Sequence, residues 1–341
     1  MKKLRLLLLT ISMLMCSVSI FAQGFEVGGI CYTIVNENSK MVGVINPQQM
    51  GRSPYSGVIS IPQIVRYGGV SYTVTDILEY AFNGIGNLTE VNIPSSIIRI
   101  SKGAFLHARQ LTSINVSDYN EKYSSKDGVL FSKDRTKLLQ YPPGNKQSTY
   151  ELPNEVANIE DIAFMTSPWL TAINVGLNNE NYSSQEGVLF SKDKKVLIRY
   201  PFRKAGSFYE IPDMVTQIAP YAFYDCFMLS EISISNNVSS IGVAAFYSCE
   251  NLTKVNMGKG NNALTIGDRS FYDCVNLTCI NLGNRVTNIG MEAFHGCPIT
   301  EIIIPNSVKS IGCYAFTSLK KITCFAQYPP IGSSCMWEGG D

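Results

Sequence analysis

A repeated pattern of apolar residues constrains the fold of this chain more than any other sequence feature. The pattern is I-x-x-x-[AS]-F-x-x-C-x-x-L-x-x-[IV]-x-[IVLM], and its clearest copy runs from Ile241 to Met257. Its phenylalanine recurs at Phe82, Phe105, Phe164, Phe223, Phe246, Phe271, Phe294 and Phe316, with spacings of 23, 59, 59, 23, 25, 23 and 22 residues. Repeats of about 20–30 residues are typical of solenoids, in which each coil buries its apolar residues by stacking on its neighbours.

The residues around each phenylalanine predict how the coils pack. An isoleucine precedes it by five residues in every copy, at Ile77, Ile100, Ile159, Ile218, Ile241, Ile266, Ile289 and Ile311. The residue immediately before it is alanine in seven copies and Ser270 in the eighth, so we expect a contact too tight for a larger side chain. A leucine and then an isoleucine or valine follow the phenylalanine in near-constant register. All four positions are therefore predicted to be buried.

The N-terminus has the features of a secretory signal peptide. Three cations in the first five residues precede an apolar run from Leu6 to Ile20, and the small Ala22 follows. This order predicts a signal peptide over residues 1–22 that is cleaved after Ala22. A membrane-spanning helix is the alternative, but the run is shorter than the about 18 residues that a span requires. Met15 is too large for the residue that precedes a lipid-modified cysteine at Cys16. We therefore expect a protein that is secreted or held at the cell surface.

Charge and length narrow the remaining possibilities. The chain has 28 lysine and arginine residues against 27 aspartate and glutamate residues, a formal net charge of +1. This balance gives no electrostatic reason to expect a nucleic acid or an anionic membrane as partner. The 341 residues could form two domains, but the repeat runs through most of them, which favours one elongated domain. We expect it to be monomeric and to have no transmembrane span after signal cleavage.

The two ends of the chain depart from the repeat. Residues 27–34, 41–45, 57–61 and 69–74 read as strands separated by glycine, proline and asparagine turns. Because the first coil of a solenoid needs a cover, residues 23–75 are predicted to form a β-rich N-terminal cap. The solenoid itself is predicted over residues 76–323, and residues 324–341 form a C-terminal cap or tail.

The two 59-residue spacings contain a second repeat. Residues 123–134, YSSKDGVLFSKD, match residues 182–193, YSSQEGVLFSKD. Strand-like runs on both sides of 133–136 and of 192–195 predict hairpins with polar tips. Since 59 exceeds 23 by 36, each spacing corresponds to one ordinary coil plus a 36-residue insertion, with the hairpins near 123–149 and 182–208. The insertions either decorate two coils or form a ridge that binds a partner.

The coil sequence A-F-x-x-C-x-x-L-x-x-I-x-[IL]-P-x-x-V-x-x-I-G, the D-G-V-L-F-S-K-D insertion and the strand-rich start resemble the BspA-like leucine-rich repeat proteins, which are exported or surface proteins of gut and oral anaerobic bacteria. The similarity covers roughly residues 25–334, although the copies at 106–108 and 165–167 lack the cysteine. It implies a leucine-rich-repeat solenoid that is β-rich with short irregular or helical convex segments. It further implies a curved, right-handed horseshoe with a parallel sheet on its concave face. Binding or adhesion without catalysis is the implied role.

Residues suited to catalysis or metal binding are sparse. His107 and His295 are the two histidines, and each lies inside a repeat, where a surface variant of the coil is the simpler interpretation. Histidine, cysteine and acidic residues do not stand at metal-ligand spacings, and there is no C-x-x-C pair. Nucleophile-elbow, phosphate-loop and dinucleotide-binding motifs are absent. The sequence therefore predicts no metal, no cofactor and no enzymatic activity.

Nine cysteines follow the predicted signal peptide. Cys226, Cys249, Cys274 and Cys297 each stand three residues after a repeat phenylalanine, which predicts a column with about 5 Å between rungs. That spacing is within reach of a disulfide, but four side chains with one orientation favour small, buried free thiols. In the tail, Cys324 and Cys335 are a candidate disulfide pair.

The candidate binding residues lie on the L-x-x-[IV]-x-[IVLM] strands. Side chains alternate along a strand, so the residues between the buried positions point outward. One outward series is nearly uniform in asparagine, serine and threonine, and the other varies, as a recognition surface would. We expect these residues on the concave face: Glu90, Asn92, Ser113, Asn115, Ala172, Asn174, Glu231, Ser233, Lys254 and Asn256.

Two functional hypotheses follow. In the first, the protein recognises a host protein, a glycan or another cell surface through this face, with the hairpin tips at Lys133-Asp134 and Lys192-Asp193 as the rival site. In the second, the repeats form a structural surface layer or spacer without a specific ligand. The sequence does not identify the ligand or the means of retention at the surface.

Overall fold

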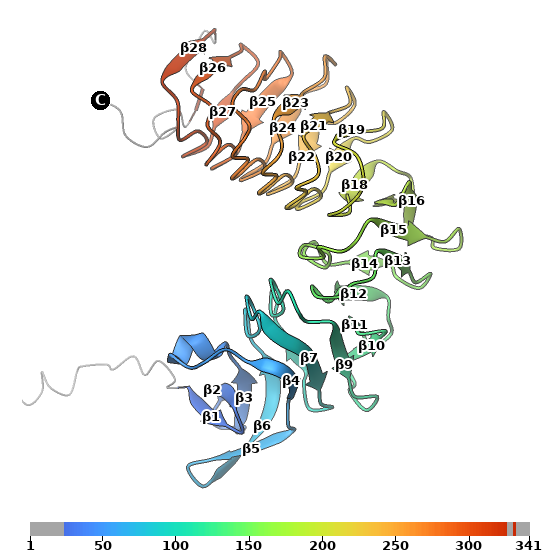
Figure 1. Ribbon diagram of the computed structural model, residues 1–341, viewed down its shortest axis with the longest axis vertical. Helices are drawn as coiled ribbons and strands as arrows, with labels where there is room; N and C mark the ends of the chain where they lie inside the picture. Colours follow the sequence, from blue (N-terminus) through green and yellow to red (C-terminus); the bar gives the residue numbers. More distant parts are fainter. Residues whose placement is uncertain (1–23, 326–329, 332–341) are drawn as a thin grey trace, which may run out of the picture.

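The computed structural model describes residues 24–325 and 330–331 of the chain. Within these residues the regular elements are strands, apart from the short 3-10 helix η1 (Pro47–Met50). The chain forms a β-solenoid of stacked coils preceded by a small mixed sheet (Figure 1). The predicted signal peptide, residues 1–22, lies outside the described residues, as does most of the predicted tail.

A mixed sheet stands before the first coil. Its strands are β1 (Phe25–Val27), β2 (Ile30–Asn36), β3 (Met41–Val44), β5 (Ile64–Tyr67) and β6 (Val70–Ile77), in the order β1-β2-β3-β6-β5. Two-residue glycine turns with positive φ, Gly28-Gly29 and Gly68-Gly69, close its outer hairpins. Strand β6 also pairs in parallel with β8 (Arg99–Ile100), which joins the sheet to the solenoid. Strands are thus present where the sequence predicts those of the N-terminal cap.

Most coils of the solenoid contribute two strands. The first series, which we call the face strands, comprises β4 (Ser56–Ser60), β7 (Asn87–Ile93), β9 (Ser113–Val116), β13 (Thr149–Leu152), β15 (Ala172–Val175), β19 (Phe208–Glu210), β21 (Glu231–Ser233), β23 (Lys254–Asn256), β26 (Glu301–Ile304) and β28 (Lys321–Cys324). The second series, the side strands, comprises β8, β14 (Asn158–Ile159), β20 (Gln217–Ile218), β22 (Ser240–Ile241), β24 (Leu264–Ile266), β25 (Val286–Ile289) and β27 (Ser310–Ile311). A turn that contains the repeat phenylalanine leads from each side strand towards the next face strand.

Face strands pair in parallel, as predicted, but not in one continuous sheet. They form four short groups, β4-β7-β9, β13-β15, β19-β21-β23 and β26-β28. The side strands are more continuous, because β18, β20, β22, β24, β25 and β27 belong to one eight-stranded sheet. Strand β4 falls in the residue range predicted for the cap, yet it pairs with β7, so coil stacking begins before residue 76.

Each insertion is a three-stranded antiparallel meander. The strands are β10 (Tyr123–Lys126), β11 (Val129–Ser132) and β12 (Lys137–Gln140) in the first copy, and β16 (Tyr182–Gln185), β17 (Val188–Ser191) and β18 (Val196–Arg199) in the second. The predicted hairpins around 133–136 and 192–195 are present, with one further strand before each. The last strand of each meander pairs in parallel with the next side strand, β12 with β14 and β18 with β20. The insertions are therefore layers of the stack and not appendages to it.

A column of aromatic rings forms the centre of the core. All eight repeat phenylalanines are buried, with relative exposures of 0–3%. Phe223, Phe246, Phe271, Phe294 and Phe316 stack with centroid distances between neighbours of 4.6, 4.9, 5.1 and 5.1 Å. In the meander layers the buried Tyr141 and Tyr200 contact the next phenylalanine ring at 5.6 and 5.0 Å. The alanine before each phenylalanine is also buried, and Ser270 fits there because its hydroxyl donates to the Gly267 carbonyl.

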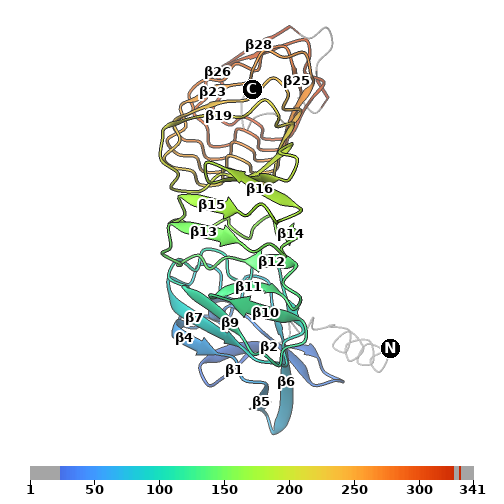
Figure 2. The ribbon, with the colours of Figure 1, turned by 90° about the vertical axis from the view of Figure 1, so that its right-hand side faces the viewer.

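The stack bends into an arc (Figure 1). Face strands β13 and β15 lie towards its outer side, and they face the viewer in Figure 2, which looks at that side. The expected concave position of the face sheet is therefore not found at the centre of the molecule. The meanders lack the phenylalanine turn, so turns 59 residues apart in sequence meet. Leu106, Met165 and Tyr224 pack in one apolar cluster on the turn side of the coils.

Candidate functional site

The ten predicted binding residues lie on β7, β9, β15, β21 and β23, and we call the surface they form the strand face. Each of their side chains is partly or fully exposed and lies next to a buried one, as Glu231 and Ser233 do on either side of Ile232. The parallel register aligns residues of neighbouring coils, for example Glu231 with Lys254 and Ser233 with Asn256. Sequence alternation therefore placed these residues on one surface correctly.

Many polar groups of the strand face bond to each other along the stack. The amide of Asn115 donates to Asn92 at 3.1 Å, and Asn92 donates to the Ser60 hydroxyl at 3.1 Å. Asn174 donates to the carboxylate of Glu151 at 2.6 Å. An amide that already has protein partners gains less from a ligand, because one hydrogen bond replaces another. This ladder stabilises the surface of the N-terminal and central coils and leaves fewer groups for recognition there.

Charged residues on the face strands are paired across neighbouring coils. Lys254 Nζ lies 2.6 Å from Glu231 Oε1, and Lys321 Nζ lies 3.6 Å from Glu301 Oε2. Both pairs are well exposed, so each contributes on the order of 0–1 kcal/mol to stability. The opposite charges leave little net field on the strand face. Attraction of a distant charged partner is consequently weak.

The meanders cover part of the strand face, which the sequence analysis missed. The turns at Asp127-Gly128 and Glu186-Gly187 have positive φ at both residues and close the β10–β11 and β16–β17 hairpins. The Gly128 carbonyl accepts from Ile114 N at 2.9 Å, which places Gly128 against Ser113. In the second copy Gly187 packs against Ala172 in the same way. The Asp-Gly dipeptide is a strong signal for such a two-residue turn and would have revealed the extra hairpin.

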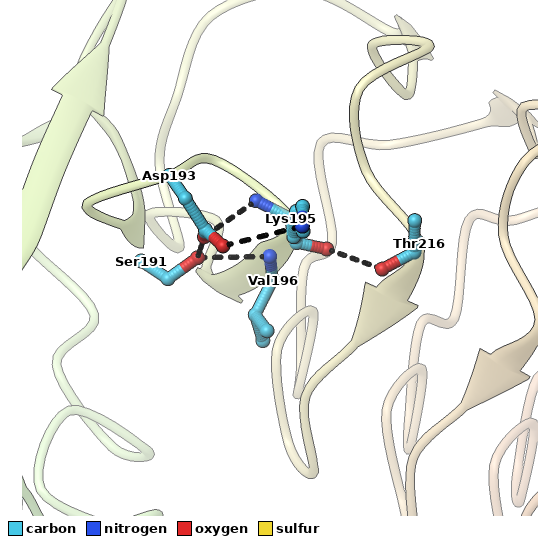
Figure 3. A network of polar contacts seen from close by, with 5 residues as sticks. All are labelled: Ser191, Asp193, Lys195, Val196 and Thr216. Atoms are coloured by element: carbon cyan, nitrogen blue, oxygen red, sulfur yellow. Dashed lines mark hydrogen bonds and ion pairs between the residues drawn. The ribbon is translucent and has the colours of Figure 1, made fainter.

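The rival site, the meander tips, is internally bonded. In the second tip Ser191 Oγ donates to Asp193 Oδ1 at 2.7 Å, and the Lys195 N–H donates to the same oxygen at 3.1 Å (Figure 3). The Ser191 hydroxyl in turn accepts from Val196 N. These hydrogen bonds lower the pKa of the Asp193 carboxyl, and the equivalent bonds lower that of Asp134. The exposed lysine and arginine side chains are thus what the tips offer to a partner.

Buried asparagines hold each meander onto the preceding coil. The Asn120 amide donates to the carbonyls of Pro94 and Ile97, both at 2.9 Å, and its oxygen accepts from Lys122 N and Tyr123 N. Asn179 makes the same four bonds one meander later. Both asparagines are fully buried. They repeat with the 59-residue period, which was the available sequence signal.

The histidines occupy coil positions without forming a site. His295 stacks on Tyr272 at 4.6 Å and extends a ladder of Tyr224, Tyr247 and Tyr272 beside the phenylalanine column. The half-buried His107 lies 6.4 Å from the Tyr224 ring. Burial, followed by the nearby charge of Arg109, lowers the pKa of His107. Over the described part of the chain, no group of three histidine, cysteine or acidic residues is arranged to hold a metal ion.

The cysteine column is formed by free thiols, as predicted. Cys226, Cys249, Cys274 and Cys297 are buried and unpaired. The last three each donate to a phenylalanine carbonyl of the preceding coil, at 3.0, 3.2 and 3.1 Å. Burial raises the pKa of the Cys226 thiol to about 12, so the column is chemically inert. The suggested disulfide between Cys324 and Cys335 is wrong, because Cys324 is a free thiol, whereas Cys313 is disulfide-bonded.

The coil sequences match the family model described as "BspA type Leucine rich repeat region". Six copies of that repeat match, over residues 52–137 and 199–323. The chain belongs to the BspA-type leucine-rich repeat family. The two unmatched stretches between and beyond these ranges include the second meander and both termini. A search of curated proteins finds no significant match.

Solved structures resemble the chain in fold. The pneumococcal vaccine antigen PcpA is 20% identical with a TM-score of 0.55, and the similarity covers 90% of this chain and 88% of the antigen. A leucine rich cell surface protein from Faecalibacterium prausnitzii A2-165 is 21% identical with a TM-score of 0.49, over 93% of this chain and 98% of that protein. At such identities the first comparison supports the solenoid fold alone.

Family membership has consequences for location and chemistry. BspA-type leucine-rich repeat proteins are cell-surface proteins, and the family consists of non-enzymatic repeat scaffolds. Among the residues that the structure describes, no helix is long and apolar enough to cross a membrane. The chain is therefore a leucine-rich-repeat surface protein, and its function has to be sought on its surface.

Proposed function

We propose that this protein is a secreted or cell-surface module that binds a host protein, a glycan or another cell surface through its strand face. The observation that carries the proposal is the register of the face strands. Exposed polar residues repeat on one side of successive coils, as in the pairs Glu90–Ser113 and Glu231–Lys254. A repeat array of this kind presents one extended surface, on which many modest contacts act together.

The form of the surface favours a large partner. The strand face is shallow and mixed in polarity, unlike the apolar concave pockets that hold small cofactors. Its C-terminal part, with Glu231, Lys254 and Asn256, has no meander over it. Contacts there would be short-ranged, so binding should depend weakly on salt. Export through residues 1–22, action as a monomer and the absence of catalysis belong to the same proposal.

A structural spacer remains the second candidate, because a specific observation favours it. The asparagine ladder through Ser60, Asn92 and Asn115 satisfies its own hydrogen bonds, as a surface without a ligand would. In this second function the repeats would set a distance or form a layer. The meander tips are the alternative location for binding within the first function.

The experiment that separates the two functions measures binding by the mature chain, residues 23–341. Immobilised host matrix proteins, mucin glycans and whole cells would be titrated with the labelled protein. Saturable binding to one of them, with little change between low and physiological salt, is the expected result. Failure to find saturable binding on any of these surfaces would favour the spacer.

A further inference from the structure

The face strands are interrupted between β23 and β26. The coil that lies between them joins its predecessor through a single bridge, Asn256–Asn281, and contributes no strand there. The interruption follows the longest of the short phenylalanine spacings, 25 residues between Phe246 and Phe271. The extra residues lie in the loop from Gly258 to Ala263, which carries Lys259. We call the resulting depression the notch.

The notch is large enough for a small ligand. A hollow of about 790 Å³ is lined by residues of β23, the 258–261 loop and the irregular coil at 279–285. A second hollow of about 480 Å³ shares Asn281, Gly283 and Asn284 with it and continues to Ile303 and Phe325. Phe325 is 64% exposed, so its ring is accessible at that end. Ligand pockets span about 300–1,000 Å³, and the larger hollow falls in this range.

A buried arginine with an unused donor lines the larger hollow. Arg285 is only 3% exposed, and its Nη1 donates to the Ser235 carbonyl at 3.1 Å while Nη2 donates to that of Val238. These carbonyls occupy the coil positions that Asn120 and Asn179 cap in the meanders, so Arg285 replaces an asparagine there with a cation. Its Nε has no hydrogen-bond partner among the described residues.

The charge of the notch is not balanced. No carboxylate is among the residues that line the larger hollow, whereas Lys254, Lys259 and Arg285 are. Glu231 pairs with Lys254, but neither Lys259 nor Arg285 has an ion pair within the described chain. Burial without an anion lowers the pKa of Arg285. A buried cation is costly unless it is paired, so this arrangement favours an anionic ligand.

We propose that the notch binds an acidic saccharide, with Arg285 and Lys259 supplying the positive charge. Asn256, Asn281 and Asn284 add amide donors and acceptors that suit sugar hydroxyls, and Phe325 offers a ring for a neighbouring sugar. An acidic peptide fits less well, because the larger hollow has no aromatic or branched apolar socket apart from Val255 for its side chains. The inference deepens the proposed binding function, on which its biological meaning rests.

Cys279 provides a direct readout, since this free, exposed thiol lines the larger hollow. In a Cys324→Ser background, which removes the exposed thiol of β28, the alkylation rate of Cys279 would be measured with increasing digalacturonic acid, a sulfated heparin disaccharide, lactose or a glutamate peptide. We expect saturable protection by one or both acidic disaccharides and none by lactose. The two acidic probes distinguish a uronate from a sulfate.

Charge reversal tests the assignment of residues. Lys259→Glu should weaken protection by about tenfold or more, as expected for the loss of a charge-assisted contact worth about 1.4 kcal/mol or more. Lys122→Glu, the same change at an exposed lysine of the first meander, is the matched control and should change it less than about twofold. Arg285→Lys keeps the charge and should weaken binding while the melting temperature reports whether the coil still folds.

Several results would overturn the proposal. They are absence of protection by either acidic disaccharide, equal protection by lactose or by the glutamate peptide, and equal loss in Lys259→Glu and Lys122→Glu. Competition for the surface partner is measured separately. Protection of Cys279 without competition would support the notch and count against the strand face as a whole. Surface binding without protection would retain the strand face and reject the notch.

Discussion

The C-terminal stack from Phe223 to Phe316 and the interrupted middle from Phe105 to Tyr200 solve the same stacking problem in different ways. In the C-terminal stack each coil repeats the contacts of the one before it, with rings 4.6–5.1 Å apart and buried thiols bonded to carbonyls. In the middle, tyrosines replace phenylalanines in the meander layers, and buried asparagines replace part of the sheet pairing.

The difference divides the core. One apolar cluster runs from Val188 through the C-terminal stack to Phe316, a second lies around the first coils, and a third lies between the two meanders. Since repeats stabilise each other through neighbour interfaces, a change should spread within a cluster more readily than between clusters. The comparison therefore predicts where damage to one coil is felt.

The largest effect is expected for Phe246→Ala in the C-terminal stack. Loss of this buried ring should lower the free energy of unfolding by about 3–5 kcal/mol. Hydrogen exchange should accelerate in the coils of Phe223 and Phe271 and much less in the N-terminal coils. The matched change in the middle is Tyr141→Phe, which removes a buried hydroxyl without a partner and should leave stability unchanged or higher. An unaltered melt for Phe246→Ala would show that the column does not hold the stack.

A smaller loss is expected for Asn179→Ala in the middle. The substitution leaves the carbonyls of Pro153 and Val156 and two N–H groups without their partner, which should cost about 2–3 kcal/mol. The loss should be measured by urea denaturation and compared with Asn181→Ala, an exposed asparagine two residues away. Equal midpoints for the two variants would mean that the asparagine bracket does not attach the meander.

Tight stacking in the C-terminal stack can be tested with a glycine pair. A Cβ added at Gly290 would lie 2.4 Å from the backbone nitrogen of Asp268, whereas one at Gly86 would have no atom within 4 Å. Gly290→Ala should therefore lower stability by about 1–3 kcal/mol through overpacking, and Gly86→Ala should not. Thermal melts of the two variants would show the difference. A melt of Gly290→Ala that matches the parent would indicate looser stacking than the structure has.

The smallest effect concerns pH. Burial lowers the pKa of His107 in the folded state below its ordinary value near 6.5, so the unfolded state binds the proton more readily. Stability contributed by the neutral ring should be present above pH 6.5 and should be lost as pH falls below it. His107→Asn, which tolerates the positive φ of this position, should flatten the change in urea midpoint between pH 7.5 and 5. An unchanged slope would place the titration elsewhere.

How much of this could be read from the sequence depended on repetition. Phe246 and its seven equivalents could be predicted as buried because eight copies keep four apolar positions in register. The outward side chains of the face strands followed from alternation alone. Gly128 and Gly187 covering the strand face did not follow, since the pairing of β9 with a hairpin turn is a contact between segments with different sequence patterns.

Curvature and disulfide pairing escaped prediction for physical reasons. The direction of bending depends on the relative thickness of the sides of each coil, and the meanders thicken the strand side while Leu106 and Met165 meet on the turn side. The role of Arg285 depends on the two extra residues before β24, which moved a capping position to another coil. Neither effect repeats along the sequence, so no periodic signal reports it.

The claim that the strand face binds the partner is tested most directly by comparing two multiple variants of the mature chain. One replaces Glu231, Lys254 and Asn256 by alanine in the C-terminal stack. The other replaces the tips at 133–136 and 192–195 in the middle by Asn-Gly turns. Affinity for the surface partner should fall in the first variant, with a melting temperature near the parent's, and should persist in the second. Binding that survives the first variant and disappears in the second would contradict the strand-face account and assign recognition to the meander tips.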